Sequence, residues 1–202
     1  ERLGRASAAR PAGPLAWFHA ASVGESLSVM PLMAALREAR PDVSLLLTTG
    51  TRTAAQVAAE RLPEGALHQY APVDGGGAPS RVVEHWRPDL AVWVESEIWP
   101  ALIDAAAEGG ARMAMVNARM AERSAARWAK APRMIGALLA RFETVLAQDA
   151  AVAARLRALG AAGAVAGGSL KAGAAPPDRP EAREALAEAC AGRPVWLAAS
   201  AH

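Results

Sequence analysis

The sequence has little of several features that usually signal a particular function. Its 202 residues contain one cysteine, Cys190, which excludes an internal disulfide and a thiolate metal site. The formal net charge is only +2, so the chain as a whole has no electric field that requires nucleic acid as a partner. The chain also lacks any run of about 18 uninterrupted apolar residues, so no transmembrane helix is predicted.

Two nucleotide-binding motifs are absent as well. Neither the P-loop pattern G-x-x-x-x-G-K-[ST] nor the dinucleotide pattern G-x-G-x-x-G occurs. The four histidines have no metal-ligand spacing, so neither a metal nor a cofactor is predicted. His19 lies in an apolar segment, and we expect a hydrogen-bonded core residue there more than a catalyst.

Short apolar segments alternate with alanine-rich, helix-forming ones about seven times. We expect strands at 16–21, 43–47, 67–71, 90–94, 112–116, 144–147 and 164–166. This alternation predicts an α/β fold with a Rossmann-like parallel sheet and helices on both faces. Two prolines modify the helices: Pro31 predicts a late start near Ser28 or a kink, and Pro132 interrupts a long helical stretch.

The domain organisation follows from composition. Residues 1–15 are a polar lead-in, and residues 16–173 form the predicted Rossmann-like domain. The proline-rich segment 174–179 is typical of an interdomain linker, followed by a helix at 181–191 and a strand from Val195. We therefore expect 174–202 to open a second domain that is truncated.

The first strand-to-helix unit contains the leading catalytic candidate. Ser22, Val23 and Gly24 follow the first strand, and we expect Gly24 to allow a tight turn. Glu25 then falls in the first turn of the helix, where the helix dipole favours an ionised carboxylate. Such a carboxylate at the end of a strand is a candidate general base. The alternative is that Glu25 is only a favourable first-turn acid.

Polar residues also follow the other strands, and the carboxyl ends of parallel strands share one edge of the sheet, where a ligand crevice forms. Thr51 or Thr53 could cap a helix instead of binding a ligand. If the backbone stays extended, Glu95 and Glu97 point to the same side; alternatively, one of them caps the next helix. The residues at this edge are Ser22, Gly24 and Glu25; Thr48, Thr49 and Thr51; Asp74; Glu95 and Glu97; Asn117 and Arg119; Gln148; and Lys171.

A basic series follows the fifth strand. Arg119, Arg123, Arg127 and Lys130 recur at spacings of three or four, which predicts one basic helix face. This face is either simply solvated or contacts phosphate or an anionic membrane surface.

The same residues resemble the amino-terminal half of 3-deoxy-D-manno-octulosonic acid (Kdo) transferases, the lipid A Kdo glycosyltransferase family of lipopolysaccharide synthesis. HAASVGE and the E-x-E-x-W-P pattern are specific together, whereas either alone would be a weak signal. The matching blocks follow the family's order: WFHAASVGE at 17–25, TTGTRT at 48–53, PVD at 72–74, ESEIWP at 95–100, NARMAERS at 117–124, AQD at 147–149, GGSLK at 167–171 and WLAASAH at 196–202.

The resemblance implies a GT-B glycosyltransferase, in which two Rossmann-like domains face a cleft. The first domain would bind a lipid A precursor as acceptor and the second CMP-Kdo as donor, in an inverting transfer that uses no cofactor. Glu25 would be the general base. The substrate-binding set would be Ser22, Gly24, Thr48, Thr49, Thr51, Asp74, Glu95, Glu97, Asn117, Arg119, Ser124 and Lys171.

The resemblance also implies that the protein acts at the cytoplasmic face of the bacterial inner membrane. There the anionic membrane surface would be contacted by Arg123, Arg127 and Lys130. Because the donor domain is nearly absent from the sequence, we expect these residues alone not to transfer sugar. Two other functions stay open. The chain could be half of another GT-B glycosyltransferase or of a sugar-nucleotide epimerase, or it could be a non-catalytic domain that binds anionic lipid.

Overall fold

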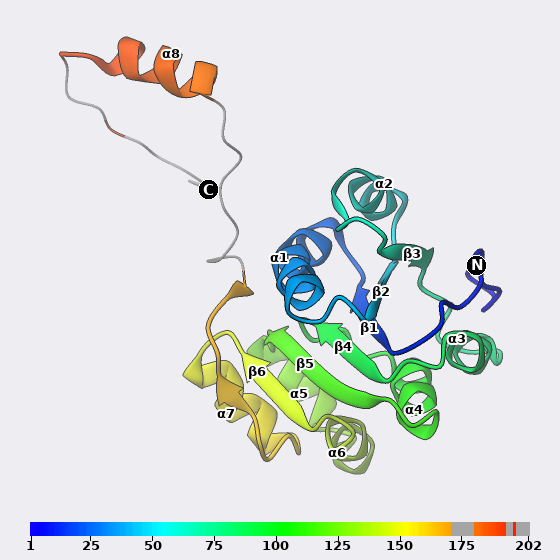
Figure 1. The fold of residues 1–202 in the computed structure, drawn as a ribbon. Coiled ribbons are helices and arrows are strands. Elements are labelled where there is room, and N and C mark those ends of the chain that lie inside the picture. The colour runs from blue at the N-terminus through cyan, green and yellow to red at the C-terminus, as the bar shows by residue number, and fades with distance from the viewer. Residues whose placement is uncertain (171–179, 193–195, 197–202) are drawn as a thin grey trace.

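A computed structural model describes residues 1–170, 180–192 and 196 of the chain (Figure 1). The predicted alternation of strands and helices is confirmed. In chain order the elements are β1 (Leu15–Ala20), α1 (Val23–Ala39), β2 (Ser44–Thr49), α2 (Arg52–Arg61), β3 (Leu67–Tyr70), α3 (Ala78–Trp86), β4 (Leu90–Val94), α4 (Pro100–Glu108), β5 (Arg112–Ala118), α5 (Glu122–Trp128), α6 (Pro132–Leu139), β6 (Thr144–Ala147), α7 (Ala150–Ala158), β7 (Val165–Ala166) and α8 (Pro180–Cys190).

The seven strands form one sheet in the order β3-β2-β1-β4-β5-β6-β7, and every pair is parallel. The chain first moves outward from β1 to β3 and then returns to the other side of β1 with β4. The direction of winding therefore reverses between β1 and β4. In open parallel sheets, ligands bind beyond the carboxyl ends of the strands at such a reversal. The segments that follow β1 and β4 are thus the first place to look for a site.

Each face of the sheet has its own apolar core, because side chains alternate between the two faces of a strand. Trp17, Leu46 and Trp93 pack with residues of α3, α4, α6 and α7 on one face. Phe18 and Leu47 pack with residues of α1 and α2 on the other. Figure 1 shows α1 and α2 on the opposite side of the sheet from α3, α4 and α6. The prediction of helices on both faces is confirmed.

Several element boundaries differ from those expected. Helix α1 begins at Val23 and continues through Pro31, so the predicted late start near Ser28 is wrong. Strand β2 runs to Thr49, and β5 runs to Ala118, so polar residues expected in turns belong to strands. The long helical stretch is divided into α5 and α6, and Pro132 is the first residue of α6, where its missing N–H costs nothing.

The amino-terminal segment is held against the domain by hydrogen bonds from both backbone and side-chain groups. The carbonyl of Arg2 accepts from Val73 N (2.8 Å), and the Arg10 guanidinium donates to the carbonyl of Trp86 (2.8 Å). The predicted linker at 174–179 and the strand from Val195 lie outside the described residues, so the domain division stays a prediction. Within the described part of the chain, no helix combines the length and the apolarity needed to cross a bilayer.

Candidate functional site

Glu25 lies in the first turn of α1, directly beyond the end of β1, and is held by a reciprocal capping arrangement. Ser22 is the N-cap residue, and its hydroxyl oxygen accepts from the backbone N–H of Glu25 (3.3 Å). In return, the Glu25 carboxylate accepts from Ser22 Oγ (2.6 Å) and from Ala21 N (2.8 Å). This pattern is a variant of the capping box, in which serine and glutamate satisfy free donors at a helix start. Glu25 is therefore a first-turn acid, as the alternative foresaw, and it also takes part in capping the helix.

The environment of Glu25 also changes its acidity. The residue is only 6% exposed. Burial raises the pKa of the Glu25 carboxyl, the charges of Glu97 and Glu95 raise it further, and the hydrogen bonds from Ser22 and Ala21 oppose them. A glutamate that only caps a helix requires neither burial nor two neighbouring acids. A carboxylate with a raised pKa is a stronger base than an ordinary glutamate.

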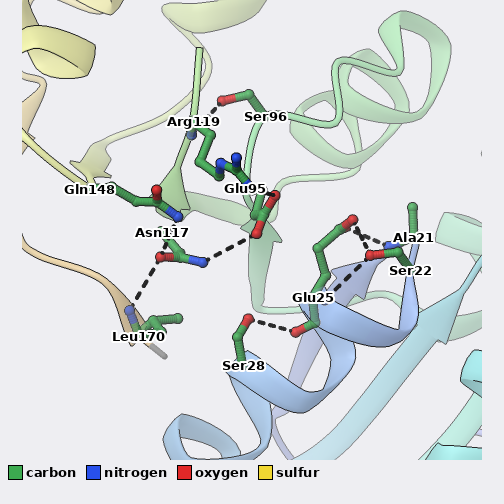
Figure 2. A network of polar contacts seen from close by, with 10 residues as sticks. All are labelled: Ala21, Ser22, Glu25, Ser28, Glu95, Ser96, Asn117, Arg119, Gln148 and Leu170. Carbon is green, nitrogen blue, oxygen red and sulfur yellow. Dashed lines mark hydrogen bonds and ion pairs between the residues drawn. The ribbon is translucent and has the colours of Figure 1, made fainter. Parts of the chain in front are cut away.

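Glu95 and Glu97 follow β4, on the other side of the winding reversal. The backbone of Glu95 has φ +59°, so the extended geometry assumed for this pair does not persist. The Glu95 carboxylate is 3.6 Å from the Arg119 guanidinium, and the Asn117 side-chain amide lies 3.5 Å from it (Figure 2). Glu97 is fixed differently, because the Trp99 indole N–H donates to its carboxylate (2.9 Å).

Asn117 connects three segments of this edge. It is buried near the end of β5, where the pairing with β6 is irregular, and its φ is +55°. Its carbonyl oxygen accepts from Gln148 Nε2 (3.0 Å) and from Leu170 N (3.2 Å), as Figure 2 shows. Left-handed backbone at a residue other than glycine is strained and clusters at functional sites. Here Glu95 and Asn117 adopt it side by side in space.

A cavity of about 450 Å³ opens beside these residues. Its lining mixes carboxylates, guanidinium groups, hydroxyls and an amide, which suits a ligand that carries both hydroxyl groups and negative charge. It includes the predicted residues Glu95, Glu97, Arg119 and Ser124. The full lining is Glu95, Ser96, Glu97, Arg119, Met120, Ala121, Ser124, Gln148, Asp149, Val152 and Arg155.

Other predicted residues have structural partners instead. Thr48 and Thr49 lie within β2, fully buried; Thr48 bonds to Trp17 and His19, and Thr49 to His68. Thr51 caps α2 by accepting from Ala54 N (3.1 Å), as the alternative foresaw. Asp74 accepts from Leu102 N (2.8 Å) and so caps α4 from a distant loop.

Gly24 does not make the turn that was expected of it. It lies within α1 with no positive φ, and a Cβ added there would meet no atom within 4 Å. In the next strand-to-helix loop, packing does require a glycine at Gly50, because a Cβ there would lie 2.8 Å from the carbonyl oxygen of Ala21. The loops after β1 and β2 thus touch through backbone, while Gly24 faces open space next to Glu25.

The basic series does not form a single helix face. Arg119 precedes α5, and its guanidinium pairs with Glu95. Arg123 and Arg127 lie on α5, and Lys130 lies in the turn after it. These three line a second hollow of about 430 Å³, together with Ser124 and Ala126. The predicted face is therefore divided between two hollows. Lys171 lies outside the described residues.

Sequence reasoning missed Arg155. It lies on α7, lines the larger cavity, and donates to the carbonyl of Met120 (2.7 Å). No pattern in the sequence marks it, because its position depends on how α7 packs beside the segment after β5. Within the described residues, no group of three or more potential metal-binding side chains comes together.

The sequence model of the family described as 3-deoxy-D-manno-octulosonic-acid transferase (Kdo transferase) matches residues 1–174. The chain belongs to the Kdo transferase family. It is 39% identical over 147 residues to the "Probable 3-deoxy-D-manno-octulosonic acid transferase, mitochondrial" of Arabidopsis thaliana, covering 72% of this chain and 33% of that protein. It is 37% identical over 208 residues to the 3-deoxy-D-manno-octulosonic acid transferase of Bordetella pertussis, covering 98% and 48%.

The chain thus spans between a third and a half of the length of these relatives. Its fold is similar to that of a putative UDP-N-acetylglucosamine 2-epimerase from Listeria monocytogenes, with a TM-score of 0.59 at 14% identity over 87% of this chain and 52% of the other. A UDP-GlcNAc 2-epimerase from Neisseria meningitidis gives 0.55 at 12% identity, over 78% and 47%. At these identities the likeness shows the fold alone, and the Rossmann-like prediction is confirmed.

Proposed function

We propose that this chain forms the acceptor-binding half of a Kdo transferase that moves Kdo from CMP-Kdo to a lipid A precursor, with Glu25 as the general base. The observation that carries the proposal is the position of Glu25 at the winding reversal of the sheet, where burial and then the charges of Glu97 and Glu95 raise its pKa. Family membership supplies the reaction class.

The proposed step begins with the ionised Glu25 carboxylate facing a hydroxyl of the acceptor. The acceptor oxygen attacks the anomeric carbon of Kdo while its proton moves to Glu25. The bond between that carbon and the CMP phosphate oxygen breaks, and CMP leaves with the electron pair. The sugar configuration inverts, because the attack comes from the face opposite the leaving group. Ser22 and Ala21 hold the carboxylate in place through their hydrogen bonds.

We assign acceptor contacts to the larger cavity. Glu95, Glu97 and Ser124 provide acceptors and a hydroxyl for sugar groups, and the Arg119 guanidinium suits a phosphate. The open space at Gly24 leaves room for the acceptor to approach the start of α1, where free N–H groups favour an anion. Lys171 stays a predicted contact.

We further propose that the smaller hollow of Arg123, Arg127 and Lys130 contacts the anionic surface of the bacterial inner membrane on its cytoplasmic face. Each cation near such a surface contributes about 1 kcal/mol, and salt weakens the attraction. Sedimentation with vesicles of phosphatidylcholine, with or without phosphatidylglycerol, tests this. Changing all three residues to glutamine should abolish the part of binding that needs phosphatidylglycerol, and retained binding would contradict the proposal.

The base assignment is tested by Glu25→Gln in the whole protein, assayed with CMP-Kdo and a lipid A precursor. We expect kcat to fall on the order of 100- to 10,000-fold, because general base catalysis contributes about that much. Glu60→Gln, on the exposed side of α2, is the matched control and should leave kcat unchanged. Full activity of Glu25→Gln would refute the assignment, and turnover of UDP-GlcNAc in place of CMP-Kdo would refute the substrate.

A further inference from the structure

His19 is a fully buried histidine that the proposed proton transfer does not use. Its Nδ1 lies 3.0 Å from Thr48 Oγ1, an oxygen that already accepts from the Trp17 indole N–H (2.9 Å). The Thr48 hydroxyl also donates to the Phe18 carbonyl (3.4 Å). The other ring nitrogen, Nε2, has no hydrogen-bond partner among the described residues.

The His19 ring packs against two tryptophans. Its centroid is 5.2 Å from that of Trp93 and 4.8 Å from that of Trp99, and its plane makes an angle of 70° with the Trp99 ring. Such perpendicular packing of aromatic rings is favourable. The His19 ring as a whole is therefore buried beside aromatic rings and does not contact water.

Both of these tryptophans hold Glu97. The Trp93 indole N–H donates to the backbone carbonyl of Glu97 (3.0 Å), and the Trp99 indole N–H donates to its carboxylate (2.9 Å). The backbone and the side chain of Glu97 are thus fixed by two indoles that share one neighbour, the His19 ring.

We propose that His19 is a positioning residue, which sets the indoles of Trp93 and Trp99 so that Glu97 stays fixed beside Glu25. The catalytic meaning of this role rests on the proposed function. The physical basis of the role is the packing of His19 on the two tryptophans and their hydrogen bonds to Glu97. Burial lowers the pKa of His19 to about 3, so the ring remains neutral and keeps the same hydrogen bonds wherever Glu25 is ionised.

By fixing Glu97, this arrangement controls how tightly the nearby Glu25 carboxylate binds a proton. Among the described residues, the charged and polar groups that act on this carboxylate are Ser22, the backbone N–H of Ala21, Glu97 and Glu95. The charge of Glu95 is balanced by Arg119. Within the part of the chain that the structure describes, the Glu97 carboxylate accepts from an indole and forms no ion pair. Its charge therefore acts on Glu25 without neutralisation, provided that the carboxylate is held in position.

The test is a side-chain carboxyl carbon NMR titration of Glu25 in this chain, without substrate. We expect His19→Phe and Trp99→Phe each to weaken proton binding by Glu25 about threefold, because Glu97 is released toward solvent. In the Glu97→Gln background, His19→Phe should cause no further change. Trp86→Phe is the matched control, since it removes an indole bond to Gln69 elsewhere in the core, and it should leave Glu25 unchanged.

An unchanged Glu25 titration in Trp99→Phe would overturn the proposal. So would an effect of His19→Phe that persists at full size after Glu97→Gln, because this would show a path other than Glu97. If His19→Phe does not fold, the Glu25 titration is compared between Trp99→Phe and the double variant Trp99→Phe with Glu97→Gln. The proposal requires the effect of Trp99→Phe to disappear in the Glu97→Gln background. The titration needs no sugar transfer, so failure of the transferase assignment would be seen separately in the assay of CMP-Kdo turnover.

Discussion

Acid should destabilise this protein through His19. The side chain is buried at 0% exposure, and burial lowers its pKa from 6.5 to about 3. Between these two values the unfolded chain binds a proton at His19 that the folded chain does not bind. The free energy of unfolding therefore falls as the pH decreases below 6.5, and this contribution to stability is fully present only above that pH.

The magnitude follows from the two pKa values. Each pH unit below 6.5 costs about 1.4 kcal/mol until the folded-state value is approached. Between pH 7.5 and pH 4.5 the loss is about 2.7 kcal/mol. Because a domain of this kind has roughly 5–15 kcal/mol of stability in total, a loss of this size is readily measured.

Urea unfolding at a series of pH values provides the assay. The chain is compared with His19→Gln and His19→Phe, all in the Glu25→Gln background, which removes the opposing contribution of Glu25. The two variants differ in packing and should differ in absolute stability. Both should nevertheless lack the acid-dependent loss of about 2.7 kcal/mol. Stability curves that run parallel to that of the chain with His19 would refute the reasoning.

Three further predictions concern the site and its supports. Glu25→Gln should raise the free energy of unfolding at pH 7, because the folded-state pKa of Glu25 is raised. The gain in stability should vanish below pH 4.5, where the carboxyl of the unfolded chain is protonated as well. Urea unfolding at both pH values checks this. Asp74→Ala should lower the free energy of unfolding in urea by about 1 kcal/mol, because the cap of α4 is lost. Asp74→Asn should keep most of that stability, because its side-chain oxygen can still accept the hydrogen bond. Equal losses of stability in the two variants would argue against capping. Gly50→Ala should destabilise the chain, because the added Cβ would lie 2.8 Å from the carbonyl oxygen of Ala21. Gly24→Ala should leave the thermal unfolding temperature unchanged but weaken acceptor binding. A lower unfolding temperature for Gly24→Ala would contradict the open space at that position.

Much of the site's location could be read from strand ends. The apolar runs mark the strands, and the polar residues after them mark the edge where ligands bind. This pattern predicts that Glu25, Glu95, Glu97 and Arg119 share one edge, and the structure brings them together. It failed for Thr48 and Thr49, because β2 continues through them and their hydroxyls bond to buried rings.

The sequence by itself determined the fold class, since apolar periodicity and helix-capping residues are local features that neighbouring residues decide. It determined that Ser22 and Glu25 meet, because a spacing of three at a helix start brings their side chains into contact. Only the tertiary structure decided that β4 lies beside β1, that Asp74 caps α4, and that His19 and two tryptophans surround the support of Glu97. These contacts join residues far apart in the chain, and their geometry depends on strand order and on the packing of whole elements, which no local pattern encodes.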